Sequence, residues 1–415
     1  MADIAPNASY HYVKMGVKAD TLDDDKFARD LVPIKQTSFE DGNEIETETD
    51  EGHTGISNLD MGSYRTTAES SPSWEDKFRY GEGLEDLFYL LLGTHTSEAG
   101  DVEGVFNHHF EMPPEVEKEL PLATIYNGFA KTKTDGRAFN NALLNEFEIT
   151  FSADDAPTIK PTFVSDYNNF NLLNPSRSFA ATSYFAKAPH TQVYVGAVGA
   201  SAAEMLEVPI DCFSEASITI NHNAESQSCH ADAFGKNTKI MGAREAEGSI
   251  TMPWVEGTKL FEPEYEAFNK YGHTVSEEIT HKQIWFRAYG GSIIRYSNSN
   301  TLGTGETLLE TIVENEGESN ETTTFKIDTG VPFETLIKCP VCELTNVESP
   351  KSGDEAKDLT MEFKILEKSE QSYITVDMVT FLENLHIDDV GTTLNDLKPT
   401  AEMDGGKYAQ FATTN

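Results

Sequence analysis

The chain has 415 residues and a formal charge of −39, with 70 Asp and Glu residues against 31 Lys and Arg residues. Its content of 38% hydrophobic and 10% aromatic residues is too high for a disordered acidic chain, so the composition indicates a folded acidic protein. Such a charge repels nucleic acid and anionic membranes, which disfavours binding through phosphate contacts. Because single cores stop growing near ~250–300 residues, the length also predicts more than one domain.

Targeting and disulfide signals are missing from the sequence. Residues 1–14 lack a basic start followed by an apolar run, and no window approaches the ~18 apolar residues that span a bilayer. We therefore expect a protein that is made in the cytoplasm and does not insert into a membrane. Four cysteines in a chain of this length do not form a disulfide framework. Reduced thiols are expected at Cys212, Cys229, Cys339 and Cys342.

Alternation of polar and apolar residues dominates the first half of the chain and predicts strands. Residues 44–50 place four acids on one face of a strand, namely Glu44, Glu46, Glu48 and Asp50. Residues 147–151 and 158–164 predict a hairpin with a turn at 154–157. Between these β regions, apolar residues at helical spacing predict one helix, through Leu84, Leu87, Phe88 and Leu91.

The second half shows the same succession of elements. Residues 217–221 alternate polar and apolar side chains, with Ser217, Thr219 and Asn221 on the polar face of a predicted strand. A looser helical pattern covers residues 260–271, and residues 363–365 and 373–380 predict a second hairpin. Each half therefore predicts a β–α–β order.

Short segments of the two halves match one another in the same order along the chain. The matching pairs are MGSYRTTAESSPSW at 61–74 with MGAREAEGSITMPW at 241–254, Val-Pro-Ile at 32–34 with 208–210, Gly-Thr-His-Thr at 93–96 with Gly-His-Thr at 272–274, and Leu-x-x-Glu-Phe-x-Ile at 143–149 with 359–365. Collinear matches predict an internal duplication. The last pair is offset further than the others, so the second copy is expected to carry an insertion.

These matches divide the chain into two repeats, at residues 1–172 and 191–390. Residues 173–190 contain two prolines and several small residues, which is typical of a linker. The insertion is placed near residues 296–324, whose Ser, Asn, Gly, Glu and Thr content predicts an acidic surface loop. Residues 391–415 are expected to form a flexible tail.

Residues with catalytic or metal-binding chemistry form no recognisable site. Cys339 and Cys342 make a C-x-x-C pair without a second pair to complete a zinc site, although Cys212 and Cys229 could in principle complete it. His108 and His109 are followed by two prolines, so a shared metal ligand role is disfavoured. Acid pairs occur throughout an acidic chain and do not indicate a glycosidase. The sequence therefore predicts neither an enzyme nor a cofactor.

Short motifs within the predicted strands and helix follow one another in a distinctive order along the chain. Gly62-x-x-Arg65 is followed by Ala-Glu-Ser at 68–70, an aromatic residue, a helix ending on Leu-Leu-Leu-Gly at 90–93, and Asn-Glu-Phe-Glu-Ile-Thr-Phe at 145–151. The second half carries Ala-Glu-Gly-Ser-Ile-Thr at 246–251. Over about residues 10–390, this order resembles the tail tube (major tail) proteins of long-tailed bacteriophages, including those of the siphovirus kind.

The resemblance implies a mainly β fold with some α structure. Each repeat would be a β-sandwich or barrel with one flanking helix, and the inner sheets of the two tandem domains would join into a closed tube on oligomerisation. Stacked rings would then build the hollow tail tube of the virion, assembled in the host cytoplasm, through which viral DNA is delivered. The resemblance carries over no catalytic residue, metal or cofactor.

Partners follow from the same resemblance. The chain would bind itself, in rings of three chains with approximate sixfold symmetry or, as the alternative, of six chains. Tape-measure, tail-tip and tail-terminator proteins would contact the tube, and double-stranded DNA would pass through without specific binding.

Polar strand faces are the candidate lumen positions, because acidic walls repel phosphate. The lumen candidates are Glu44, Glu46, Glu48, Asp50, Ser217, Thr219 and Asn221, and the candidates for an inter-ring or surface loop are Asn298, Thr304, Glu314 and Glu318. A solvated outer face remains the alternative for the acidic strand. A carbohydrate- or host-binding β-sandwich is the alternative for the whole chain, and a metal-dependent hydrolase is a third.

Overall fold

The structure of the chain is a computed structural model that describes residues 11–17, 32–34, 38–49, 63–112, 120–129, 136–166, 169–172, 184–187, 190–207, 209–210, 212–228, 237–253, 281–314, 322–348, 358–367 and 372–385. These residues are mainly in β-strands, as predicted.

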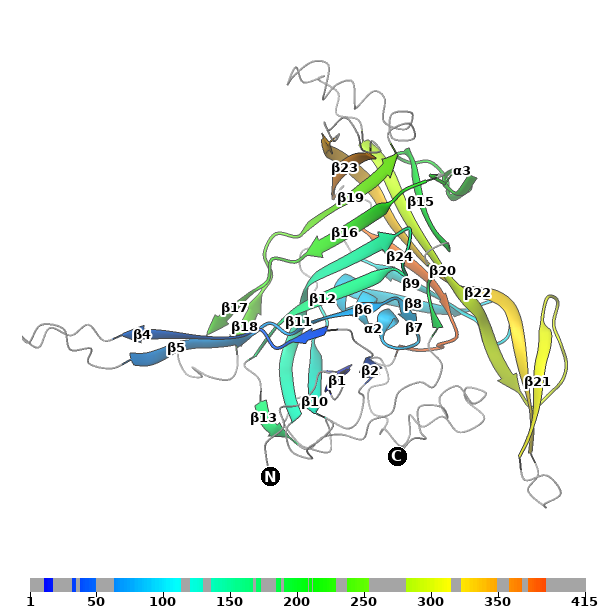
Figure 1. Cartoon of the computed structure of the whole chain (residues 1–415), viewed down its shortest axis with the longest axis horizontal. Coiled ribbons are helices and arrows are strands. Elements are labelled where there is room, and N and C mark those ends of the chain that lie inside the picture. Colours follow the sequence, from blue (N-terminus) through cyan, green and yellow to red (C-terminus); the bar gives the residue numbers. More distant parts are fainter. Residues whose placement is uncertain are drawn as a thin grey trace, which may run out of the picture.

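Eight antiparallel strands form one continuous sheet, here called the inner sheet, in the spatial order β3–β6–β12–β11–β16–β19–β23–β22. Their bounds are β3 (Ser38–Glu40), β6 (Ser73–Lys77), β12 (Thr158–Asp166), β11 (Gly136–Ser152), β16 (Glu215–Asn221), β19 (Glu245–Pro253), β23 (Asp358–Ile365) and β22 (Thr322–Glu348). In Figure 1 the sheet runs from β12 and β11 near the centre to β23 near the top. The predicted hairpin of β11 and β12 is confirmed.

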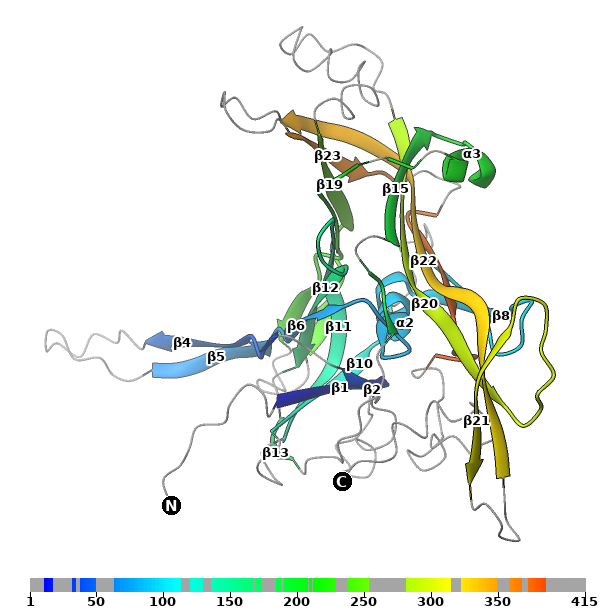
Figure 2. The ribbon, with the colours of Figure 1, turned by 45° about the vertical axis from the view of Figure 1, so that its right-hand side comes forward.

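A second layer, here called the outer layer, packs behind the inner sheet. The long strands β11 and β22 take part in both layers, because their N-terminal halves pair with outer strands. The outer strands are β1 (His11–Val17), β2 (Val32–Ile34), β8 (Thr94–Ala99), β9 (Phe106–Glu111), β10 (Ala123–Phe129), β13 (Asn169–Leu172), β15 (Thr191–Ala197), β20 (His281–Ser297) and β24 (Thr375–Thr380). Figure 2 shows β19 and β23 on one side and β15 and β20 on the other.

Helix α2 (Leu84–Leu92) lies between the layers and confirms the predicted helix. Its sequence LEDLFYLLL consists largely of strong helix formers. Gly93 ends the helix with a φ of 83°, a left-handed conformation that glycine adopts without a steric penalty. Its N–H donates to the Tyr89 carbonyl at 2.9 Å. A short second helix, α3 (Ala202–Glu207), lies on the outer side of β15.

One hydrophobic core spans both halves of the chain. Phe151 in β11 stacks on Phe286 in β20 with ring centroids 5.4 Å apart, and Phe286 stacks on Phe363 at 6.3 Å. The Tyr80 hydroxyl donates to the Ala288 carbonyl at 3.2 Å. Because these contacts are buried and join distant parts of the sequence, the two halves do not have separate cores.

The strands fall into two sets with the same connections. β1, β10, β11 and β12 pair successively in the first set, and β15, β20, β22 and β23 do so in the second. The registers also correspond, with Ile125↔Phe139 and Leu144↔Phe163 in the first set against Ile284↔Cys339 and Leu344↔Phe363 in the second. Register shifts follow Ala123 and Leu144 in one set and Lys282 and Leu344 in the other. In the inner sheet, β3 and β6 extend the first set and β16 and β19 extend the second. The strands β11 and β16 join the two sets edge to edge.

Each set also carries a hairpin beyond the inner sheet. These are β4 (Asn43–Thr49) with β5 (Ser63–Ser70), and β17 (Glu225–Ser228) with β18 (Asn237–Ile240). The first projects far from the body in Figure 1. The chain turns from β3 into β4 at Gly42, where φ is 56° and a Cβ would lie 2.3 Å from the Ser71 carbonyl oxygen. Asn223, with a φ of 48°, occupies the corresponding place before β17.

Several sequence predictions are wrong in detail. The motif match between residues 143–149 and 359–365 relates β11 to β23, although β23 has the place that β12 has in the first set. Strand β24 pairs with β22 and β9 instead of forming a hairpin with β23. Alternating apolar residues identify a strand but not its neighbour, so both errors have the same cause.

Residues 184–187 and 190 are the part of the predicted linker that the structure describes. Strand β14 (Tyr184–Phe185) pairs with β7 (Arg79–Tyr80), and Ala186 is fully buried, so the end of the linker packs onto the body. The helical pattern at 260–271 and the tail at 391–415 lie outside the described residues.

The predicted loop at residues 296–324 contains strands. The distal half of β20, β21 (Thr307–Glu314) and the first half of β22 form a three-stranded arm, with β22 in the centre. That this segment is an insertion stays a prediction; β10 and β11 of the first set carry no such arm among the described residues. The prediction of a loop is wrong. Polar β-branched residues such as Thr307 and Thr311 favour an exposed strand as readily as a loop.

Two buried histidines connect the strand sets. His108 in β9 bonds through Nε2 to the Leu382 carbonyl at 2.8 Å, and His222 after β16 bonds to the Leu91 carbonyl at 3.0 Å. Because a carbonyl only accepts, each Nε2 carries the proton. Burial lowers the pKa of both imidazoles from the usual 6.5 to about 4. Asp76 opposes this trend, since burial raises its pKa from 3.8 to about 6.

Acid is therefore expected to destabilise the chain. A group whose pKa is lowered on folding stabilises the native state above its unfolded pKa, and that stability is lost as the pH falls from 6.5 to about 4. Each histidine lowers the free energy of unfolding by about 3 kcal/mol over this range. Protonation of Asp76 between pH 6 and 4 raises it by about 3 kcal/mol, so the net loss of stability is about 3 kcal/mol. Urea unfolding at pH 7, 5.5 and 4.5 measures it. The variant His222→Gln keeps a donor for Leu91 and should show a shallower decline, whereas an unchanged decline contradicts the assignment to His222.

Candidate functional site

The inner sheet has one apolar face and one polar face. In β16, Ala216, Ile218 and Ile220 are buried in the core, and the alternate residues point to the opposite face. The same alternation holds in β11, where Phe147, Ile149 and Phe151 are buried, and in β19 and β23. Strands that are buried on one side and open on the other produce this pattern. The open side, here called the polar face, extends across both strand sets.

Side-chain hydrogen bonds connect neighbouring strands on the polar face. The hydroxyls of Ser217 and Ser249 lie 2.9 Å apart, and those of Thr251 and Thr360 lie 3.0 Å apart. Asn221 donates to a Glu146 carboxylate oxygen at 3.0 Å across the joint between the strand sets. The polar face is therefore one connected surface, formed by residues from both halves of the chain.

Acidic residues outnumber basic ones on the polar face. Its charged side chains on the central strands are Glu146, Glu148, Glu215, Glu245, Glu247, Asp358 and Glu362 against Lys160 and Lys364. The lysines stand opposite acids, Lys160 beside Glu148 and Lys364 beside Glu247, and opposite charges in such positions attract weakly. A surface on which hydroxyls and carboxylates outnumber the lysines offers little to hold an anion.

The lumen candidates taken from the sequence fall in two places. Ser217, Thr219 and Asn221 are half-buried on the polar face. Glu44, Glu46 and Glu48 belong to β4, in the hairpin that leaves the inner sheet at Gly42. Asp50 lies outside the described residues. The structure thus does not bring the two candidate groups onto one strand face.

The surface-loop candidates lie in and beside the arm. Asn298 and Thr304 are exposed between β20 and β21, and Glu314 is the exposed last residue of β21. Glu318 lies outside the described residues.

Sequence reasoning missed most charged residues of the polar face. Glu148 and Lys364 stand within segments that predicted strands, but alternation does not reveal which strands share a sheet. Only the register, with Glu148 next to Thr219 and Thr219 next to Glu247, places them on one surface.

The described cysteines include two that are buried in the core and one that is exposed. Cys339 and Cys342 are buried free thiols, and a hydrogen bond with Cys342 together with burial raises the pKa of Cys339 well above its ordinary value. Cys212 is also a free thiol, exposed at the surface. No group of three metal-binding side chains occurs within the described residues. In that same part of the chain, no helix has both the length and the apolar character of a membrane span.

Comparison with known proteins identifies the family. The sequence model for the phage tail tube protein matches residues 22–281, which is more than half of the chain. No curated protein gives a significant match. Tail tube families are structural rather than enzymatic, and their place is the phage tail. The mainly β fold is consistent with such a protein. The chain therefore belongs to the phage tail tube protein family, and it is a structural protein of a phage tail.

Proposed function

We propose that this chain carries two tandem tube domains and that three chains close one ring of a hollow tail tube. The observation that carries this proposal is the repeated pairing order of the two strand sets, with matching register shifts in β11 and β22. Independent strands would rarely repeat both a topology and its irregularities, because a β-bulge is a specific local feature. Three chains with two domains each would then supply the six domains of one ring.

The joint between β11 and β16 is a template for the joint between chains. It pairs the last strand of the first inner-sheet set with the first strand of the second, from Glu146↔Asn221 to Ser152↔Glu215. Among the described strands, β3 and the C-terminal end of β22 are the two edge strands of the inner sheet. We propose that the end of β22 pairs with β3 of the next chain. Closure of this kind removes both edges.

The polar face is proposed to line the lumen. An acidic and hydroxyl-rich wall repels DNA phosphates and lets the duplex slide, whereas the apolar face is committed to the core. The acids of β4 would line the path from one ring to the next, because their hairpin projects past the edge of the inner sheet. Stacked rings would deliver viral DNA and contact tape-measure, tail-tip and tail-terminator proteins.

A carbohydrate-binding module has less support. Such a site needs exposed aromatic rings close together, and the exposed large hydrophobic side chains of the described residues include a single aromatic one, Phe185. The tube therefore remains the proposed function.

Lysines on the polar face should impair DNA passage. Replacing Ser217 and Ser249 with lysine adds cations that bind phosphate in place of uncharged hydroxyls. We expect tubes to assemble and DNA ejection to slow at least tenfold, with the delay shrinking at high salt. Ejection from phage particles carrying each variant, followed by dye fluorescence, measures this.

The matched control places the same two charges on the outer layer, as Ala202→Lys with Ala203→Lys in exposed helix α3. It should eject DNA at the wild-type rate. Equal ejection rates for the Ser217 and Ser249 variant and the wild type would contradict the lumen assignment.

A further inference from the structure

The arm is a single layer with two different faces. Residues opposite one another on β21 and β22 share a face, so Leu308, Thr311 and Val313 lie beside Ile327, Phe325 and Thr323. The other face carries Glu310 opposite Lys326, and Glu314 opposite Thr322. Apart from Arg295, which lies opposite Ile327 at the base, the first face is therefore uncharged and rich in apolar groups, and the other face is charged.

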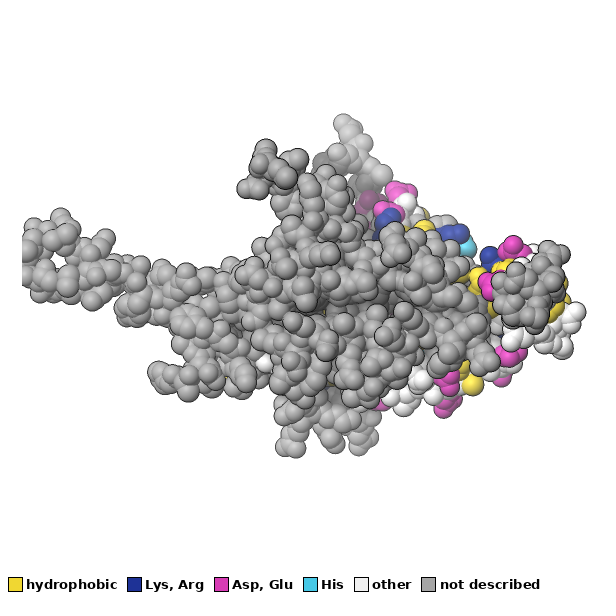
Figure 3. Space-filling view, turned by 90° about the horizontal axis from the view of Figure 1, so that it is seen from below, with side chains coloured by type: hydrophobic (Ala, Val, Ile, Leu, Met, Phe, Trp, Pro, Cys, Tyr) yellow, Lys and Arg dark blue, Asp and Glu magenta, His cyan; other side chains and the backbone are white. Residues whose placement is uncertain are grey.

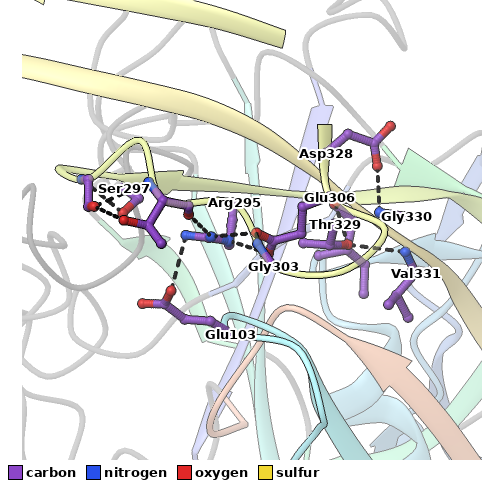
Figure 4. Close-up of polar contacts among 12 residues, drawn as sticks. Glu103, Arg295, Ser297, Gly303, Glu306, Asp328, Thr329, Gly330 and Val331 are labelled. Carbon is purple, nitrogen blue, oxygen red and sulfur yellow. Dashed lines mark hydrogen bonds and ion pairs between the residues drawn. The ribbon is translucent and has the colours of Figure 1, made fainter. Parts of the chain in front are cut away.

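A buried ion pair holds the base of the arm. The Arg295 guanidinium makes two bonds of 2.8 Å to the Glu306 carboxylate, and it also binds the Thr301 carbonyl at 3.3 Å. Its remaining contact is Glu103, 3.1 Å away in the turn between β8 and β9 (Figure 4). A two-pronged contact between a guanidinium and a carboxylate fixes orientation as well as position. The segment between β20 and β21 is thus tied down over the base, and Ile327 beneath it is fully buried.

Beyond this base the arm is open. Leu308, Leu309 and Val313 are 40%, 50% and 42% exposed. Among the described strands, β21 pairs with β22 alone, so its other edge presents unpaired N–H and C=O groups. Figure 3 shows apolar side chains next to acidic ones at the arm end of the molecule. An open edge strand with alternating apolar residues is a template for a further strand.

Charge argues against a second copy of this chain as the occupant. The arm, taken as residues 293–330, contains Glu306, Glu310, Glu314, Glu316, Glu318, Glu321 and Asp328 against Arg295 and Lys326. If two arms paired edge to edge through β21, the acids of one arm would face those of the other, and the two copies would repel one another there. A segment that matched the arm would place apolar side chains beside Leu308 and Val313 and basic side chains beside Glu310 and Glu314.

We propose that β21 binds an extended segment of a different protein, in which basic and apolar side chains alternate, and that this segment adds to the arm as a fourth strand. The arm belongs to the outer layer, away from the polar face, so it is accessible whether or not the polar face lines a lumen. Main-chain hydrogen bonds to β21 would supply affinity, and the two faces of the arm would fix the register of the bound segment.

A labelled peptide of alternating lysine and valine, with blocked ends, tests this on the purified full chain by fluorescence anisotropy. We expect saturable binding, and at least tenfold weaker binding of the same peptide carrying N-methyl groups at alternate residues. N-methylation removes the main-chain donors and keeps the charge, so it separates strand addition from general attraction to an acidic protein. Absence of binding, or equal binding of both peptides, overturns the proposal.

Matched variants locate the contact on the arm. Leu308→Glu with Val313→Glu alters the apolar face and should weaken peptide binding at least tenfold. Thr307→Glu with Ile312→Glu adds the same charge to the opposite face, beside the basic side chains of the bound segment, and should strengthen binding or leave it undiminished. Circular dichroism checks that both fold. Equal effects of the two double variants, or self-association of the wild-type chain that the first double variant abolishes, would contradict the proposal.

Discussion

A chain with cysteines at Glu348 and Glu40 is expected to give covalent trimers when assembled tubes are treated with a short bifunctional maleimide. Inside the chain, β11 pairs with β16 through Glu148↔Thr219 and Thr150↔Ser217. By the corresponding registers, Glu348 has the place of Glu148, and Glu40 has that of Ser217. The two cysteines would therefore lie two residues apart in register across the proposed joint between neighbouring chains, within reach of the reagent. Denaturing electrophoresis should show dimers and trimers, with the closed trimer as the largest main product.

The background for this experiment lacks the other accessible thiols. Cys212 is exposed and is replaced with serine, as is Cys229, while Cys339 and Cys342 are buried and unreactive. As a control, Glu348→Cys is combined with Glu314→Cys at the arm, which should give no ladder. A ladder that continues to hexamers would contradict the three-chain ring, and cross-linking by the control pair alone would contradict the proposed joint.

Replacing Phe151 with alanine should destabilise the whole chain by about 3–5 kcal/mol, the usual cost of removing a buried phenylalanine ring. Its ring is fully buried and contacts both Phe78, at 5.9 Å, and Phe286, at 5.4 Å. Because these partners belong to different strand sets, the loss should reach both. Urea unfolding is to be followed through single-tryptophan chains that keep either Trp74 or Trp285.

One shared transition is expected from both tryptophans, at a lower urea concentration than in the parent chain. Phe185→Ala is the matched control, since this ring is 38% exposed and its loss should cost about 1 kcal/mol or less. Two separate transitions, with only the one reported by Trp74 shifted, would show that the strand sets unfold independently and would contradict a shared core.

The sequence predicts local elements of this fold well. Helix α2 and the β11–β12 hairpin depend on patterns of neighbouring residues, such as Leu84 and Leu87 at helical spacing, and both are confirmed. The placement of Ser217, Thr219 and Asn221 on the same side of one strand also follows from local alternation.

The sequence did not predict which distant strands pair with one another, and the reason is physical. A strand shows which residues share a face, but its partner is set by packing across the sheet. The second half therefore matched β11 to β23 through a shared motif, although β22 has the corresponding position. Strand β4 was a better acidic candidate than β11 by composition alone, and only the turn at Gly42 separates it from the inner sheet.

A helical reconstruction of assembled tubes by electron microscopy tests the central claim most directly, because it counts chains and places their strands. We predict three chains per ring with approximate sixfold symmetry, β22 of each chain beside β3 of the next, and Ser217, Ser249 and Glu247 facing the lumen. Six chains per ring, or a lumen lined by other strands than those of the inner sheet, would contradict the account.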